Sequence, residues 1–270
     1  MKFSGMIKAM GNKHFNNKYI ARTFWITIII AAWQGISTSG VFSPLIFPSV
    51  TTIIKALFLA LKNGEIVSET AFSLLLIGKG LMSGIILAVL FSSLSLASRT
   101  FRGFMETITA IAHPLPGIAL LPIIILWLGT GEDSIVFIII HSVLWPLVLN
   151  ITAGFRSVPQ IYRDVGENMG LNRLQMISGI MIPASLPYII AGIKIGWARS
   201  WRALISAEMI FGAVGGKGGL GWYIFKQRVF MDTPGMFAGL IVIVFLGILV
   251  EDLVIGSIEG KTVRKWGKVI

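Results

Sequence analysis

Residues 164–183 read Asp-Val-Gly-Glu-Asn-Met-Gly-Leu-Asn-Arg-Leu-Gln-Met-Ile-Ser-Gly-Ile-Met-Ile-Pro, a mostly polar segment between two long apolar ones. Gly170 lies six positions after Asp164 and thirteen before Pro183, and Ile180 and Ile182 stand just ahead of that proline. Polar groups are costly inside a bilayer. We therefore expect this segment to lie in water and to contact a partner outside the membrane.

The residues of this segment predict two short helices joined by a reversal. Pro159 starts a new segment after the fourth span, since proline suits the first turn of a helix. Within this segment, one short helix is expected at 164–169. Gly170 suits a reversal that needs positive φ. A second helix is expected at 173–181, with an apolar stripe of Leu174, Ile177 and Met181. The result would be a rigid knob between two apolar segments, and the alternative is an amphipathic loop that rests on lipid headgroups.

The composition is that of an integral membrane protein. Mean hydropathy is +0.83, 55% of the 270 residues are hydrophobic and 13% are charged, whereas soluble domains carry about 25% charged residues. The chain has no cysteine, which excludes disulfides and cysteine nucleophiles.

Apolar runs long enough to cross about 30 Å of hydrocarbon recur along the whole chain. We predict an all-α, polytopic fold with about six transmembrane helices, at residues 20–38, 74–97, 108–128, 134–153, 186–211 and 236–255. Pro114, Pro116 and Pro122 should bend the third span, as a pathway-lining helix or only as a kinked one. Residues 50–62 have the spacing of an amphipathic helix at the outer interface.

The net charge of +11 is explained by topology. With both termini in the cytoplasm, only Lys55, Lys62, Lys217, Lys226 and Arg228 of the 23 basic residues fall in outer segments. This bias follows the positive-inside rule, and anionic headgroups rather than nucleic acid are the expected partner. The first span has no cleavage site and is interpreted as a retained helix rather than a signal peptide.

The predicted organisation is one membrane domain with two short tails. A cytoplasmic segment covers residues 1–22, the transmembrane domain covers 23–258 with its cytoplasmic loop at about 156–185, and a cytoplasmic tail covers 259–270.

The spacing of residues 164–183 resembles the loop by which permease subunits of ABC importers dock on their ATPase, E-A-A-x3-G-x9-I-x-L-P. The stretch from Leu186 to Gly196, then 201–209, is similar to the fifth span of the nitrate/sulfonate/taurine group of these permeases. Phe47-Pro48-Ser49 and Gly218-Gly219-Leu220-Gly221 are also similar to that group. The sequence departs where the family has Glu-Ala-Ala and this chain has Asp164-Val165-Gly166.

The resemblance implies the transmembrane domain of a type I ABC importer in the cytoplasmic (inner) membrane of a prokaryote. It implies a second permease subunit (as a homodimer), two cytoplasmic ABC ATPase subunits and an extracytoplasmic solute-binding protein as partners. ATP and Mg would be bound by the ATPases and no cofactor by this chain. The residues that it assigns to ATPase coupling are Asp164, Val165, Gly166, Gly170, Ile180, Ile182 and Pro183.

The fifth predicted span carries charges that a lipid-facing helix would not hold. The residues singled out as a translocation pathway are Lys194, Trp197, Arg199, Trp201, Arg202 and Glu208. Charges at such positions should face protein or water and be paired. One interpretation is an electropositive route for an anion, and the other is a set of interhelical ion pairs that holds the assembly together.

No residue pattern indicates an enzyme. His14, His113 and His141 are isolated, without metal-ligand spacing, and Glu132 and Asp133 are expected in a solvated outer turn. The glycine-rich stretch 212–221 does not fit a nucleotide loop and indicates a flexible outer turn or a hinge. The expected function is a non-catalytic permease for a small anion such as nitrate, bicarbonate or an alkylsulfonate such as taurine. The alternative is a secondary transporter or channel that needs no ATPase.

Overall fold

The computed structural model describes residues 2–262, with side chains described for residues 20–260 and Thr262. Within that part of the chain the regular structure is helical, apart from one isolated bridge between Val214 and Lys217. The elements are α1 (Lys2–Thr38), α2 (Val50–Lys62), α3 (Glu65–Ala97), α4 (Arg99–Ala112), η1 (Gly117–Leu120), α5 (Leu121–Leu128), α6 (Glu132–Ser157), α7 (Gln160–Asn168), α8 (Arg173–Met176), η2 (Ile177–Met181), α9 (Ile182–Ala184), α10 (Leu186–Phe211), α11 (Leu220–Val229), α12 (Thr233–Leu249), η3 (Val250–Ile255) and α13 (Gly256–Lys261).

The described helices supply between four and six membrane spans. The four that are long and apolar enough by themselves are Ile20–Thr38, Glu65–Ala97, Glu132–Ser157 and Thr233–Gly260. Two bent pairs would supply one broken span each, namely Arg99–Ala112 with Gly117–Leu128, and Arg173–Ala184 with Leu186–Phe211. The prediction of about six spans holds when each bent pair is one span.

The predicted boundaries were most accurate where the helix is apolar at both of its ends. The fifth span matches α10 at both ends, but the second begins at Glu65 rather than at residue 74. The first turns of α3 were missed because they contain the polar residues Glu65, Ser68 and Glu69, which interrupt the apolar pattern. Glu132 and Asp133 lie in the first helical turn of α6 rather than in a solvated turn, where acidic side chains are favourable.

The bend predicted from prolines in the third span is present. The axes of α4 and the following helical segment differ by 90° across the break that contains Pro114 and Pro116. Arg199 of α10 donates from Nη2 to the backbone carbonyl of His113 at 3.0 Å, so the break is anchored to a neighbouring helix.

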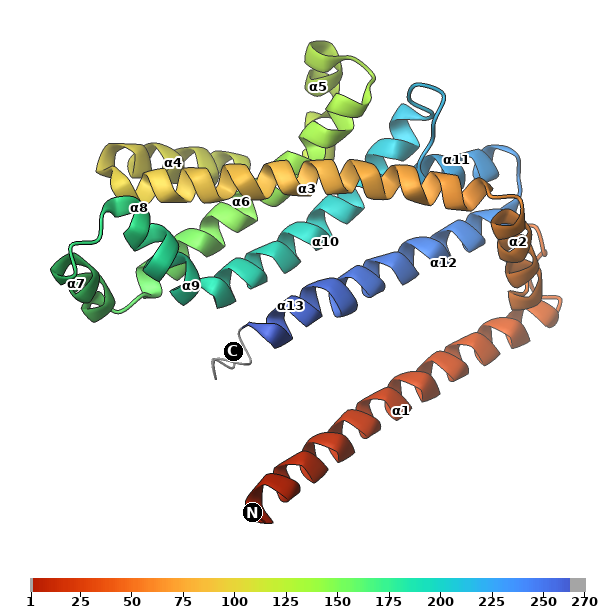
Figure 1. Ribbon diagram of the computed structural model, residues 1–270. Coiled ribbons are helices and arrows are strands. Elements are labelled where there is room, and N and C mark those ends of the chain that lie inside the picture. Colours follow the sequence, from red (N-terminus) through yellow and green to blue (C-terminus); the bar gives the residue numbers. More distant parts are fainter. Residues whose placement is uncertain (1, 263–270) are drawn as a thin grey trace.

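The core is built around α6, which packs against α3 and α10 (Figure 1). Val143 of α6 is fully buried, and its side chain fits against Gly84 of α3 and Gly196 of α10. A Cβ added to Gly84 or Gly196 would lie 2.1 or 2.4 Å from a Val143 methyl carbon. Small residues of this kind allow membrane helices to approach closely.

Helix α1 extends away from the bundle formed by the other helices (Figure 1). No residue of its apolar window is buried. Its attachment lies near its C-terminal end, where Trp33 stacks on Phe47 at 4.1 Å between ring centroids and donates from Nε1 to the Pro48 carbonyl at 2.9 Å. Most of the predicted tail 259–270, including Arg264, lies outside the described residues.

Candidate functional site

The candidate site is a helical hairpin between α6 and α10, made of α7, α8, η2 and α9 (residues 160–184), which we call the knob. It lies at one end of the helix bundle, while α2 and α11 lie at the opposite end (Figure 1). The predicted helix–reversal–helix arrangement is therefore present, with both of its ends joined to core helices.

The reversal at Gly170 follows from local hydrogen bonding. Gly170 has φ of +73°, a conformation that costs other L-residues steric strain. The Gly170 amide donates to the Glu167 carbonyl at 2.9 Å and the Leu171 amide to the Gly166 carbonyl at 3.0 Å. This pair of bonds is a Schellman motif, which satisfies the last carbonyls of α7.

A capping box begins the second arm of the knob. The Asn172 side chain accepts from the Gln175 amide at 2.9 Å, and the Gln175 side chain accepts from the Asn172 amide at 2.9 Å. The expected helix at 173–181 is present within the helical segment Arg173–Ala184, although residues 177–181 form a π-helical turn. Part of the expected apolar stripe was wrong: Met181 is 1% exposed, but Leu174 is 75% exposed.

Gly166 closes the hairpin. It is buried, and an added Cβ would lie 2.6 Å from Met176 Cε and 2.8 Å from Ile180 Cδ1. The first arm is tied to α6 by Arg163, whose Nη2 donates to the Phe155 carbonyl at 2.7 Å. The knob is thus packed internally and attached to the membrane helices.

Apolar side chains remain exposed on the outside of this packed hairpin. Ile161, Val165 and Met169 are spaced by four residues, share a face and are 62%, 46% and 72% exposed. Tyr162 and Leu174 are also exposed. Of these, Val165 was singled out from the sequence, whereas Ile161 and Met169 were missed, although their spacing by four in a polar segment was a usable signal.

The other predicted coupling residues support the hairpin or its base. Asp164 is exposed and accepts from Gln160 Nε2 at 2.9 Å. Ile180 and Pro183 line a cavity of about 560 Å³ at the junction with α6 and α10. Ile182 packs against the core cluster that contains Met181. The assignment of these residues to ATPase contact stays a prediction.

Two of the three basic residues of α10 have partners on other segments of the chain. Lys194 pairs with Glu259 of α13, and Arg199 contacts His113 after α4. Arg202 is exposed and donates from Nε to the Ala198 carbonyl of its own helix at 3.0 Å. Glu259 and His113 are partners that the sequence did not indicate. Of these three contacts, only the one between Lys194 and Glu259 is an ion pair between helices. Both the ion-pair interpretation and the role of these residues in a pathway stay predictions.

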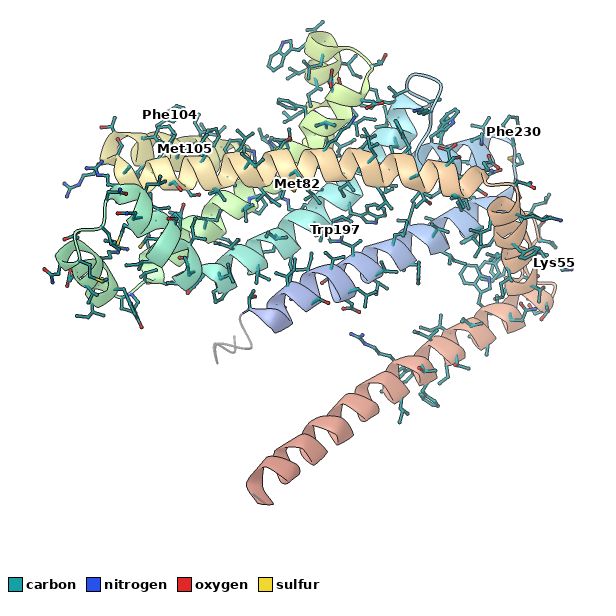
Figure 2. The ribbon with its side chains drawn as sticks, in the orientation of Figure 1. Lys55, Met82, Phe104, Met105, Trp197 and Phe230 are labelled. Atoms are coloured by element: carbon teal, nitrogen blue, oxygen red, sulfur yellow. The ribbon has the colours of Figure 1, made fainter. Side chains whose placement is uncertain are left out.

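Trp197 and Trp201 of α10 are buried and stack on each other, with ring centroids 5.4 Å apart and planes inclined by 18°. Trp197 lies midway along α10 (Figure 2). Trp201 also contacts α12, because a Cβ added to Gly247 would lie 3.3 Å from its Nε1.

Glu208, the last predicted pathway residue, is 1% exposed and holds three segments together. Its carboxylate accepts from Ser73 Oγ of α3 at 2.7 Å and from the Gly221 amide at 2.9 Å. Ser73 Oγ in turn accepts from the Leu220 amide at 2.9 Å. No pattern in the sequence indicated Ser73 as this partner.

The glycine-rich stretch lies over that carboxylate. A Cβ added to Gly219 would lie 2.1 Å from Glu208 Oε1, and one added to Gly218 would lie 2.7 Å from Glu69 Oε2. Val214 and Lys217 bond to each other in both directions around Gly215 and Gly216, both with positive φ. The predicted outer turn is therefore a tight two-residue reversal.

The same end of the bundle holds a second polar cluster. Lys226 pairs with Glu65, and its Nζ lies 5.8 Å from the ring centroid of Tyr223. Burial, together with the negative charges of Glu65 and Asp232, raises the pKa of Tyr223 to about 12. Tyr223 is therefore a neutral hydroxyl at physiological pH. Among the described residues, no group of three or more His, Cys, Asp or Glu side chains could hold a metal ion.

The bundle of apolar helices with a polar hairpin between two of its spans has a counterpart among solved structures. A chain from a structure of the MetNI methionine ABC transporter in inward facing conformations superimposes on it with a TM-score of 0.51 and 14% identity, covering 77% of this chain and 96% of that chain. At this identity the likeness shows the fold.

The family follows from the sequence match. Residues 80–264 match the family model of the binding-protein-dependent transport system inner membrane component, and the chain belongs to that family.

Named relatives come from several transport systems. The taurine transport system permease protein TauC of Escherichia coli is 26% identical over 84% of this chain and 82% of its own length. The putative aliphatic sulfonates transport permease protein SsuC of Bacillus subtilis is 28% identical over 88% of this chain and 84% of its own length. The nitrate import permease protein NrtB of Synechocystis is 32% identical over 63% of this chain and 59% of its own length.

Proposed function

We propose that this chain is the permease subunit of an ABC importer and that it receives its driving force through the knob. Two cytoplasmic ABC ATPase subunits would bind ATP and Mg and dock on the knob. An extracytoplasmic solute-binding protein would deliver the solute at the opposite end of the bundle. The chain itself would carry no hydrolytic site.

The observation that carries this proposal is the exposed apolar face of α7. Exposed apolar residues are ordinary when scattered, but a contiguous set marks an interaction site. Ile161, Val165 and Met169 form such a set on a segment that is too polar to lie in lipid. Because the hairpin beneath them is closed by Gly166 and tied by Arg163, a partner bound there would move the hairpin as a unit.

The proposed mechanism is alternating access. The knob is continuous with α6 and α10, the two helices that pack most closely in the core. ATP-driven closure of the partners would shift the knob and rock these two helices together, which opens a central route. Motion of packed units as rigid bodies requires little internal repacking.

We propose a small anion of the nitrate, bicarbonate or alkylsulfonate (taurine) type as the solute. The names of three relatives support this class, since they refer to taurine, aliphatic sulfonates and nitrate. Arg199 and Arg202 on α10 would favour an anion electrostatically. Contact between solute and these side chains, or Lys194, is part of the proposal.

We propose further that two permease subunits, as a homodimer, form the assembly in the cytoplasmic membrane of a prokaryote. The apolar window Ile20–Thr38 of α1 has no residue buried within the chain. Lipid and a second copy are the environments that would cover it. A helix with this little contact to its own bundle is available to pack on another subunit.

The test is co-purification and uptake. The tagged chain, purified in mild detergent from its own host, should recover an ABC ATPase, and ATP depletion should abolish solute uptake. Val165→Asp places a charge in the apolar face and should lose both the ATPase and uptake. Glu167→Ala, on the opposite face of α7, should retain both. Recovery without any ATPase, together with uptake that survives ATP depletion, would favour a secondary transporter or channel.

A further inference from the structure

A small cavity of about 70 Å³ lies where α3, α4, α6 and α7 meet. Three arginines line it, Arg102, Arg156 and Arg163, together with the hydroxyl-bearing residues Ser92, Ser95 and Thr152. No carboxylate is among its described lining residues. The cavity therefore presents several donors and positive charge to whatever occupies it.

Two of these donors are buried without a hydrogen-bond partner within the described part of the chain. Ser92 is 1% exposed, and its Oγ has no partner. Arg163 Nε is likewise buried and unpaired, although the Nη2 of the same side chain is fixed by the Phe155 carbonyl. Buried polar groups in folded proteins are nearly always paired. The residues that carry both donors line the same cavity, and an acceptor bound there would supply the missing partner.

The surrounding ion pairs leave the cavity positively charged. Arg102 is held by its Nε, which donates to the Ser95 carbonyl at 3.0 Å. Arg156 pairs with Glu106, but both side chains are more than half exposed and the pair is open to solvent screening. Glu106 lines the larger neighbouring cavity and not the small one.

The neighbouring cavity is larger, at about 690 Å³, and shares Ser95, Arg102, Thr152 and Arg156 with the small one. Apolar residues line much of it, including Val148 of α6 and the buried Met105 of α4, which is labelled in Figure 2. A polar, cationic chamber thus adjoins a roomier and more apolar one.

We propose that the small cavity binds a tetrahedral oxyanion of the phosphate class, either free in solution or as the phosphate of an anionic lipid headgroup. A single water needs about 10–15 Å³ of such space, so the cavity is large enough for a four-oxygen anion. Arginine forks bind such groups with two parallel hydrogen bonds. The unpaired Ser92 Oγ and Arg163 Nε would complete the set of donors.

Binding of an oxyanion in the small cavity would affect the knob, because Arg163 belongs to α7 while Ser92 and Arg102 belong to α3 and α4. An oxyanion bound by all three would fasten the knob to these helices. This role is separate from the docking of an ATPase, since the cavity lies at the base of α7 and the apolar face of α7 points outward.

Two probes test the proposal on the purified full chain. In neutral detergent, the midpoint of thermal unfolding is measured against inorganic phosphate, with sodium chloride at matched ionic strength to remove general screening. In nanodiscs, amide hydrogen exchange of residues 160–168 is compared between phosphatidylcholine alone and phosphatidylcholine with phosphatidylglycerol. The variants are Ser92→Ala and Arg102→Gln, and the matched control is Arg99→Gln, an exposed arginine of α4 outside both cavities.

The wild type and Arg99→Gln should be stabilised by phosphate, by phosphatidylglycerol or by both. Ser92→Ala and Arg102→Gln should need about tenfold more phosphate, the loss expected for one hydrogen bond to a charged group, and should lose the lipid-dependent protection. Stabilisation by inorganic phosphate alone identifies the occupant as a free oxyanion, and stabilisation by phosphatidylglycerol alone identifies it as a lipid headgroup. If Arg102→Gln does not fold, the response of Ser92→Ala tests the proposal by itself. The proposal is overturned if neither probe has an effect, which would leave water as the occupant, or if the variants respond as Arg99→Gln does.

Discussion

The carboxylate of Glu208 accepts a hydrogen bond of 2.7 Å from the hydroxyl of Ser73, a residue 135 positions earlier in the chain. The same carboxylate holds the Gly221 amide, and the Ser73 hydroxyl holds the Leu220 amide. One buried group on α10 therefore joins α3 to the start of α11. A buried carboxyl group in this position needs such hydrogen-bond partners.

Ser73→Ala should lower the stability of the chain, because it removes one partner of a buried carboxylate. Loss of a hydrogen bond to a charged group costs about 1.5–3 kcal/mol. The midpoint of thermal unfolding in detergent should fall by several degrees. Ser68→Ala is the matched control on α3, since its hydroxyl is exposed and, among the described residues, bonds to the Glu65 carbonyl alone. Equal behaviour of the two variants would mean that the Glu208 contact does not contribute.

Gly166→Ala and Gly166→Leu should show how large a side chain the knob accepts at this position. The atoms nearest to an added Cβ are the ends of the Met176 and Ile180 side chains, which can move. Alanine should therefore cost little and retain uptake. Leucine needs more room than these side chains can yield and should push the two arms apart. ATPase recovery and uptake should fall together in the leucine variant. Full uptake by that variant would show that close packing at Gly166 is not required.

Gly170→Ala should destabilise the knob by about 1–2 kcal/mol, because alanine is strained at φ of +73°. Gly179→Ala is the control, since no atom lies within 4 Å of its added Cβ and its backbone is helical. Alanine is favoured over glycine in such a position. Amide hydrogen exchange across residues 160–184 should accelerate in the first variant alone. Faster exchange in both would argue against the strain at Gly170 as the cause.

Lys194 and Glu259 allow a direct test between an ion pair and a pathway. Their side chains are 36% and 26% exposed, so a screened pair should contribute about 1 kcal/mol or less. If pairing is the role of Lys194, Lys194→Met and Glu259→Gln should each reduce stability, and the double variant should recover part of the loss. Uptake should follow stability. Loss of uptake in Lys194→Met that Glu259→Gln does not restore, at unchanged stability, would assign Lys194 to the anion route.

Much of this fold could be predicted because each span is a local property. A run such as 186–211 forms a helix of the same bounds in the structure, since its apolar residues and its starting proline act on the chain nearby. The reversal at Gly170 was also predictable, because one residue with positive φ determines it. The π-helical turn at Ile177–Met181 was not, because nothing in the residue types distinguishes it from an α-helix.

The sequence by itself determined that the chain crosses a membrane, that a polar hairpin interrupts its spans, and which family it resembles. These are properties of composition and spacing, which act over a few turns of helix. Only the tertiary structure decided which helices face one another, and hence that Glu208 meets Ser73, that Lys194 meets Glu259 and that Val143 fits between two glycines. Contacts between distant residues depend on the packing of whole helices, which hydropathy and charge do not specify.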